Sequence, residues 1–315
     1  GSAAAPDAGA AAGGGADERC GAASGTADLT VRLLGPVEVY RDPQRRIPAR
    51  AWKIRRAFQV FCFLAVARDH HATRERLADV LWSDARPSAI ERSFHPTISC
   101  LRRALNHAHD VPKSFLQYGR GGYLLNPAYR YDIDTEAFEA LVQAARRKAS
   151  RGDAPGALAD YESGLALYRG PLLEDDYDRW IEAPRHRYET LYAAALGEAG
   201  ELHLGRGGAE AAEACFRTLV DRSPLDEQVS GRLMRALGAH RDGAGIEKEY
   251  ARLSQALAEE RAAPPRPETH RVFDESLAAA AATGGGEEGR AARAVPPAPP
   301  AARHASRRGP EAVES

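Results

Sequence analysis

Arginine, histidine and serine side chains recur at helical spacing in residues 87–106, PSAIERSFHPTISCLRRALN. At 100° per residue, one side of this predicted helix collects mostly polar residues, which are Arg92, His95, Pro96, Ser99, Arg103 and Asn106. The other side collects the positions that favour a core, which are Ile90, Phe94, Thr97, Ile98, Leu101 and Leu105. Guanidinium groups pair with guanine edges in the major groove of DNA, and Ser and His adapt to several bases. The spacing predicts a helix that packs by one face and binds nucleic acid by the other.

Both the start and the middle of this helix carry local signals. Ser88 followed by Glu91 matches a capping box, with Pro87 just outside it, so we expect the helix to begin at Ser88. Pro96 lies inside the helix, where it removes one backbone hydrogen bond at a cost of about 3 kcal/mol. Because a residue before proline is pushed away from helical geometry, we expect a kink near His95.

Charge is distributed unevenly over the 315 residues, which suffice for two globular domains. Residues 29–131 carry 18 basic and 8 acidic side chains, whereas residues 132–279 carry 19 and 28. The net charge of −1 therefore conceals a basic half and an acidic half. Compositional bias towards arginine would act on both halves alike. The asymmetry favours a protein that binds a polyanion by its first half only.

Several functional classes lack support in the sequence. No run of 18 or more apolar residues and no secretory signal pattern is present, so we expect a cytoplasmic protein without a membrane partner. The four cysteines have no metal-ligand spacing, and the histidines at 70–71 and at 107 and 109 are expected at the surface. The acidic run 174–178 is predicted to be a solvated loop. We find no nucleophile with its base, and we expect neither an enzyme nor a cofactor or metal.

The elements that must position the helix begin with strands. Residues 29–40 predict two short strands that turn at Gly35-Pro36, with a third near residues 46–47. From residue 53 the apolar positions recur every three or four residues, which indicates a buried helix face. Thr73 is the expected N-cap of a second helix. The helix at 87–106 is then the third.

A basic-tipped hairpin follows the third helix. Residues 114–118 and 123–126 alternate like strands around a glycine-rich turn with Arg120 at its tip. Strands, three helices and such a hairpin make a winged helix-turn-helix, an α+β domain that we place at residues 29–127. In this fold the third helix enters the major groove and the hairpin reaches a neighbouring backbone or minor groove.

The predicted DNA contacts follow from this arrangement, although each of them could instead belong to a solvated surface. The candidates for base contacts on the third helix are Arg92, His95, Ser99 and Arg103. The candidates for phosphate contacts are Arg102 at the flank of that helix, Lys53, Arg55 and Arg56 at the start of the first helix, and Arg120 in the wing.

The rest of the chain is predicted to be helical. Two similar segments place Phe216 and Tyr250 34 residues apart, the period of a tetratricopeptide repeat, and residues 152–161 fit the same pattern out of phase. We therefore predict an all-α helical-repeat domain at residues 134–277. Residues 1–28 and 278–315 are rich in Ala, Gly or Pro and are predicted to be disordered tails.

Several motifs in this order carry a resemblance to a known family. The recognition-helix pattern Leu101–Leu105, the preceding segment Arg74–Trp82 and the wing Gly119–Leu125 match the DNA-binding domain of OmpR-type regulators. With the helical repeats and the connecting segment Tyr168–Leu173 near Trp180, residues 29–277 resemble the SARP/AfsR-like regulators with their bacterial transcriptional activator domain.

The resemblance implies a bacterial transcriptional regulator that binds specific double-stranded DNA in the nucleoid. It also implies an activator that contacts RNA polymerase, a peptide or protein partner, or a second copy through residues 134–277. No nucleotide-binding G-x-x-x-x-G-K-[ST] loop is present, so we expect the short form without an ATPase module. The alternative is a tetratricopeptide-like scaffold whose winged helix binds protein, and the net charge of +10 on residues 29–131 argues against it.

Overall fold

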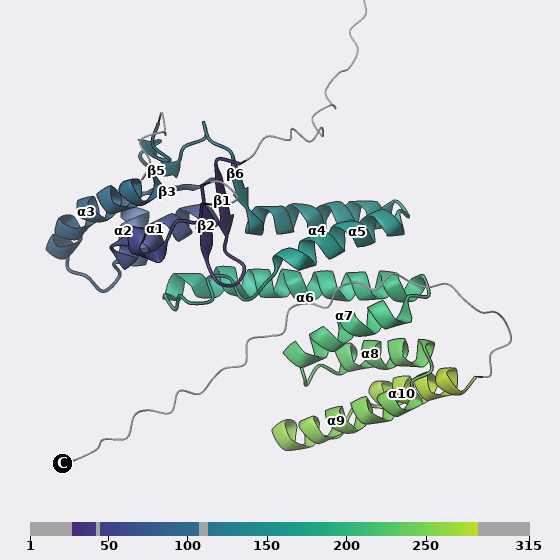
Figure 1. The fold of residues 1–315 in the computed structure, drawn as a ribbon. Coiled ribbons are helices and arrows are strands. Elements are labelled where there is room, and N and C mark those ends of the chain that lie inside the picture. Colours follow the sequence, from purple (N-terminus) through teal and green to yellow (C-terminus); the bar gives the residue numbers. More distant parts are fainter. Residues whose placement is uncertain (1–26, 42–44, 107–112, 283–315) are drawn as a thin grey trace, which may run out of the picture.

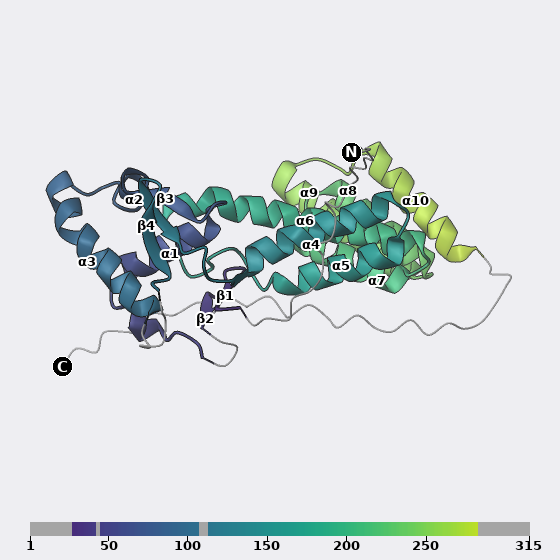
Figure 2. The ribbon, with the colours of Figure 1, turned by 90° about the horizontal axis from the view of Figure 1, so that it is seen from above.

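The computed structural model describes residues 27–41, 45–106 and 113–282. Most of the tails predicted to be disordered, residues 1–28 and 278–315, lies outside the described residues, as do His107 and His109, which were expected at the surface. Residues 278–281 are described and form the end of a helix, so the predicted disorder is wrong there. The described chain is elongated, with helix α3 (Pro87–Leu105) at one end and helix α10 (Pro267–Ala281) at the other (Figure 2). It is mainly helical, with small sheets near the N-terminus, so the predicted fold class is confirmed.

Two three-stranded sheets belong to the N-terminal half. In the first, β1 (Leu29–Arg32) lies between the antiparallel β2 (Glu38–Tyr40) and the parallel β6 (Tyr131–Ile133). In the second, β5 (Gly122–Leu125) lies between β3 (His71–Thr73) and β4 (Leu116–Gly119), antiparallel to both. The β1–β2 pair and the β4–β5 hairpin confirm four of the predicted strands. The third strand expected near residues 46–47 is wrong, since only an isolated bridge joins Arg46 to Tyr40 there. Strands β3 and β6 were not predicted.

Three helices pack between these sheets. They are α1 (Arg55–Val66), α2 (Arg74–Leu81) and α3, preceded by the 3-10 helix η1 (Ala49–Trp52). Phe61 of α1 and Phe94 of α3 are fully buried. Thr73 is the N-cap of α2 as predicted, because its side-chain oxygen accepts a hydrogen bond from the Arg76 amide at 3.1 Å.

The predicted start of α3 at Ser88 is wrong. Arg86 is the N-cap, in an extended conformation, and Pro87 occupies the first turn of the helix. The fixed φ of proline suits this position, where its missing N–H would have no helical partner anyway. Helix α3 continues through Pro96 to Leu105 without interruption, and the kink near His95 stays a prediction.

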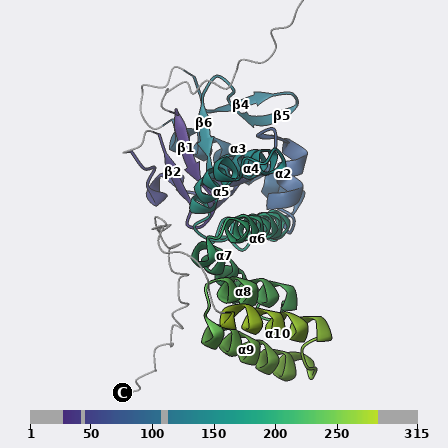
Figure 3. The same ribbon diagram turned by 90° about the vertical axis from the view of Figure 1, so that its right-hand side faces the viewer.

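The C-terminal half stacks helices in antiparallel neighbours (Figures 1 and 3). Besides α10, the helices of this half are α4 (Asp134–Ser150), α5 (Ala154–Leu167), α6 (Glu182–Gly205), α7 (Ala209–Arg222), α8 (Glu227–Ala239) and α9 (Gly243–Arg261). Small residues allow their close approach, since a Cβ at Gly200 would lie 2.6 Å from the Phe216 ring. Within the described ranges, no helix is long and apolar enough to span a membrane.

Hydrogen bonds to Leu33 and Leu34, just after the end of β1, join the two halves. Asp134, in the first turn of α4, is fully buried and accepts hydrogen bonds from the amides of Leu33 at 2.8 Å and Leu34 at 3.0 Å. The segment before η2 (Arg179–Ile181) adds a further bond, from the Leu173 amide to the Leu33 carbonyl at 2.8 Å. These bonds fix the helical stack against the strand that starts the DNA-binding half.

The acidic run 174–178 completes this joint and is not simply a solvated loop. Asp176 is only 6% exposed and accepts hydrogen bonds from Arg55 at 3.0 Å and from the amide of Gln59 at 3.1 Å. Asp178 pairs with Arg56 at 3.1 Å. The prediction of a solvated loop is therefore wrong for Asp176, because basic and amide groups on α1, far away in the sequence, neutralise it.

Candidate nucleic-acid interface

Helix α3 presents two faces of opposite character, as its sequence predicted. Phe94, Ile98 and Leu101 are buried. The exposed face carries the predicted base contacts, Arg92, His95, Ser99 and Arg103. The one polar residue on the inner face, Thr97, donates its hydroxyl hydrogen to the Ser93 carbonyl at 2.8 Å, so that its burial leaves no unmet hydrogen bond.

Aromatic contacts fix the position of this helix. The Phe94 ring lies 5.4 Å from Trp82 and 5.6 Å from Tyr123 of the hairpin, and the Arg74 guanidinium lies over it at 5.3 Å. Trp82 also donates a hydrogen bond to the Ser93 hydroxyl at 2.9 Å. Helix α2, helix α3 and the wing therefore share one packed cluster, which holds the exposed face in a constant orientation.

The wing is built by a two-residue turn. Arg120 and Gly121 have φ values of 54° and 73°, as a tight hairpin between twisted strands requires. Arg120 is exposed at the tip, where the sequence placed it. Tyr118 on β4 is 64% exposed and rests edge-on against Tyr123 at 5.2 Å. Tyr118 is a further candidate contact that the sequence analysis missed, because strand alternation alone does not distinguish a solvent-facing aromatic residue from a core residue.

Four of the five predicted phosphate contacts fall into two groups. Lys53 and Arg102 line one hollow beside α3, together with Arg103, which was predicted to contact bases. Arg55 and Arg56 instead form ion pairs with Asp176 and Asp178 of the other half. The structure thus gives these two guanidiniums a role in the joint, and it does not bring them together with the exposed face of α3.

His70 and His71 both depart from their predicted surface positions, because their side chains are only 20% and 15% exposed. The His70 ring bonds to Glu136 at 3.0 Å and to the Leu64 carbonyl at 3.1 Å. The hydrogen bond with Glu136 of α4 holds the pKa of the His70 imidazole above its ordinary value. His70 therefore bridges the two halves of the chain.

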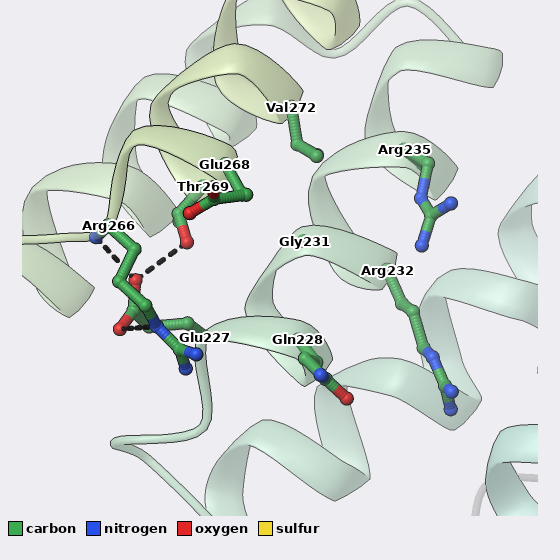
Figure 4. A pocket seen from close by; sticks show the side chains of 9 residues that line it. All are labelled: Glu227, Gln228, Gly231, Arg232, Arg235, Arg266, Glu268, Thr269 and Val272. Atoms are coloured by element: carbon green, nitrogen blue, oxygen red, sulfur yellow. Dashed lines mark hydrogen bonds and ion pairs between the residues drawn. The ribbon is translucent and has the colours of Figure 1, made fainter.

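A second hollow lies in the helical half, between α8 and α10 (Figure 4). Glu227 is buried there and accepts hydrogen bonds from the Arg266 guanidinium at 2.8 Å and the Thr269 hydroxyl at 2.6 Å. Burial alone would raise the pKa of the Glu227 carboxyl, and these hydrogen bonds lower it below its ordinary value. Arg232 and Arg235 lie across the hollow on α8 (Figure 4). This hollow offers polar groups of both signs to a partner.

Metal-ligand clusters and reactive thiols are two features that the described ranges can be searched for. These ranges contain no group of three or more His, Cys, Asp or Glu side chains that could hold a metal ion. The Cys62 thiol is buried, and burial raises its pKa well above the ordinary value. Such a thiol stays protonated and unreactive.

Comparison with known proteins agrees with this architecture. The family model of the bacterial transcriptional activator domain matches residues 133–277. The transcriptional regulatory protein MoaR1 of Mycobacterium tuberculosis is 26% identical over 254 residues, which cover 78% of this chain and 78% of MoaR1. The regulatory protein DnrI of Streptomyces peucetius is 29% identical over 237 residues, which cover 73% of this chain and 81% of DnrI.

A solved structure shows the same fold. Mycobacterium tuberculosis EmbR, in complex with a low-affinity phosphopeptide, superposes with a TM-score of 0.66 at 24% identity over 80% of this chain. The matched part spans 65% of the EmbR chain.

Together, a winged helix with a free basic helix face and a bacterial transcriptional activator domain define a DNA-binding transcriptional regulator. More narrowly, the chain is similar to the SARP/AfsR-like regulators, and its residues 133–277 match the bacterial transcriptional activator domain. The reading of the chain as a scaffold protein is not favoured, because the relatives are named as regulators.

Proposed function

We propose that residues 29–127 bind a specific duplex by inserting α3 into the major groove and resting the β4–β5 wing on the adjacent backbone or minor groove. The observation that carries this proposal is the outer face of α3, where four hydrogen-bonding side chains are exposed beside a buried apolar face. The wing tip supplies a fifth, Arg120. Base contacts by Arg92, His95, Ser99 and Arg103 would give sequence preference.

The helical half is the proposed contact for RNA polymerase or another protein. Residues 133–277 match the activator domain, and the hollow between α8 and α10 presents charged groups to solvent. Stacked helical repeats use such extended surfaces for protein binding. We infer an activator that acts at the bacterial nucleoid and carries out no catalysis itself.

Selection of bound sequences from a random duplex library, followed by titration at fixed salt, tests the DNA contacts. Replacement of Arg103 or Arg120 by alanine should weaken binding to the selected duplex by about tenfold or more, as expected for loss of an arginine contact worth about 1–3 kcal/mol. If both variants bind the selected duplex as the parent does, this assignment of contacts is wrong.

Light scattering tests self-association through residues 134–277. A dimer, free or on DNA, supports a symmetric contact between two copies. A strict monomer in both states rules out the dimer and leaves a heterologous partner, which capture of purified RNA polymerase by the DNA-bound protein would test.

A further inference from the structure

A hollow in the DNA-binding half lies between η1 and the C-terminal turns of α3. Arg50 comes from η1, Lys53 follows it directly, and Arg102 and Arg103 come from the last turn of α3. Asn106, just after the helix, adds a polar side chain. The hollow therefore collects four cations from two segments that are about fifty residues apart in the sequence.

None of these four cations is neutralised within the described part of the chain. The lining of the hollow contains no carboxylate, and the four side chains have no hydrogen-bond or ion-pair partner among the described residues. Arg41, by contrast, has a partner within the chain. Its guanidinium donates a hydrogen bond to the Leu105 carbonyl at 2.9 Å, one of the backbone carbonyls at the C-terminal end of α3. Like charges that lie close together repel one another and lower the stability of the fold. A cluster of cations without anionic partners is therefore typical of a binding site.

The hollow of Figure 4 shows that this lack of partners is not general in the chain. There Arg266 bonds to Glu227, and Arg232 lies 3.4 Å from Glu201. In that hollow, Arg266 and Arg232 are thus matched by carboxylates. The four cations beside α3 lack such partners, and a bound anion would supply them.

We propose that this hollow binds a backbone phosphate of the DNA duplex, and that Arg50 joins Lys53, Arg102 and Arg103 there as a contact that the sequence did not predict. The proposal rests on the proposed function, since Arg103 lies both on the exposed face of α3 and in the hollow. A strand that passes the C-terminal end of α3 would meet all four cations. Phosphate contacts carry no base information, so this site sets the position and depth of α3 in the groove.

The double variant R50A/K53A tests the site. Its affinity for the selected duplex and for a random duplex of equal length should fall by a similar factor, about tenfold, because the lost contacts do not specify sequence. The slope of log affinity against log salt should become shallower by up to about one unit, since one neutralised phosphate contributes about 0.9. The control variant K248A/R261A removes the same two charges from exposed positions of α9 at the far end of the chain, and it should change neither quantity.

The outcomes separate this site from the proposed function. If R50A/K53A keeps the affinity and salt slope of the parent while R120A weakens binding to the selected duplex, the phosphate site is refuted and the DNA-binding function stands. If the parent itself does not distinguish the two duplexes, the proposed function fails. Circular dichroism and thermal unfolding verify that R50A/K53A folds like the parent.

Free polyphosphate is the other ligand that could place phosphate groups in this hollow. Calorimetric titration of the DNA-free protein with pyrophosphate should show no saturable binding at physiological salt, because an open site for one diester phosphate holds a small anion weakly. Saturable pyrophosphate binding that R50A/K53A abolishes, with an unchanged salt slope on DNA, would overturn the assignment to duplex DNA.

Discussion

The Asp176 carboxylate accepts a hydrogen bond from the Arg55 guanidinium at 3.0 Å, across 121 residues of sequence. The same carboxylate accepts a bond from the amide of Gln59, which is 2% exposed. An acidic loop of the helical half thus satisfies a buried amide and a basic side chain of α1. This contact, with the bonds from Asp134 to the Leu33 and Leu34 amides after β1, joins the two halves.

Replacement of Asp176 by alanine should lower the free energy of unfolding. Gln59 would stay buried without its acceptor, and an unsatisfied buried polar group costs about 1–3 kcal/mol. Urea unfolding followed by circular dichroism measures the loss. Asp175, an exposed neighbour in the same loop, is the matched control, and its alanine variant should remain within about 0.5 kcal/mol of the parent. Equal stability of the two variants would show that the Asp176 contacts contribute nothing.

The joint between His70 and Glu136 should weaken as the pH rises. The folded protein holds the pKa of His70 above its ordinary value of 6.5. The contribution of this pair is therefore fully present below the pKa of the unfolded chain and is lost as the pH rises through the folded pKa. The loss should be below about 1 kcal/mol, because Glu136 is half exposed and solvent screens the pair.

The variant H70N isolates this effect, since asparagine tolerates the positive φ of 51° at this position. Urea unfolding at pH values from 6 to 8.5 should show the parent losing stability relative to H70N as the pH rises. Parallel pH profiles of the two proteins would disprove the linkage.

Replacement of Gly122 by alanine should disrupt the wing. A Cβ at this position would lie 2.3 Å from the Ala72 carbonyl oxygen, so strands β3 and β5 must separate. We expect a loss of about 1–3 kcal/mol in the free energy of unfolding, together with weaker DNA binding because Arg120 is displaced. The alanine variant of Gly205, where no heavy atom lies within 4 Å of the added Cβ, should be neutral or slightly stabilising. Thermal unfolding of the two variants, and titration of each with the selected duplex, measure these effects.

Replacement of Pro96 by alanine should stabilise α3. Proline removes a backbone hydrogen bond inside this helix, and its exposed position means that alanine leaves no cavity. We expect a gain of about 1–3 kcal/mol in the free energy of unfolding. If the helix is also bent at Pro96, repeating the duplex selection with P96A should yield a different preferred sequence for the side chains before residue 96. An unchanged or lower stability would show that the chain has adapted to the proline.

Local signals in the sequence predicted most of the DNA-binding half. The two faces of α3, the Thr73 cap and the turn at Arg120 each depend on residues within a few positions of one another, so periodicity and turn preferences are sufficient. The start of α3 was missed for a local reason as well. Ser88 and Pro87 gave competing signals, and the preference of proline for the first turn of a helix prevailed.

Long-range pairings were beyond sequence reasoning. Strand β6 pairs with β1 across about one hundred residues, and no local pattern marks Asp176 as the acceptor for Gln59. The cation hollow has the same origin. Lys53, Arg102 and Arg103 were each predicted to contact DNA, but only the packing of η1 against α3 brings them together with Arg50.

The backbone joint at Leu33 and Leu34 has a consequence for promoter architecture. Asp134 and the segment before η2 fix the helical stack relative to the DNA-binding half. The stack therefore projects from the bound duplex at one fixed angle around the duplex axis. Moving the binding site by about five base pairs would turn the stack to the opposite side of the duplex, and moving it by about ten would return it to the same side. Transcription from such a promoter should therefore oscillate with the spacing, in phase with the helical repeat of DNA.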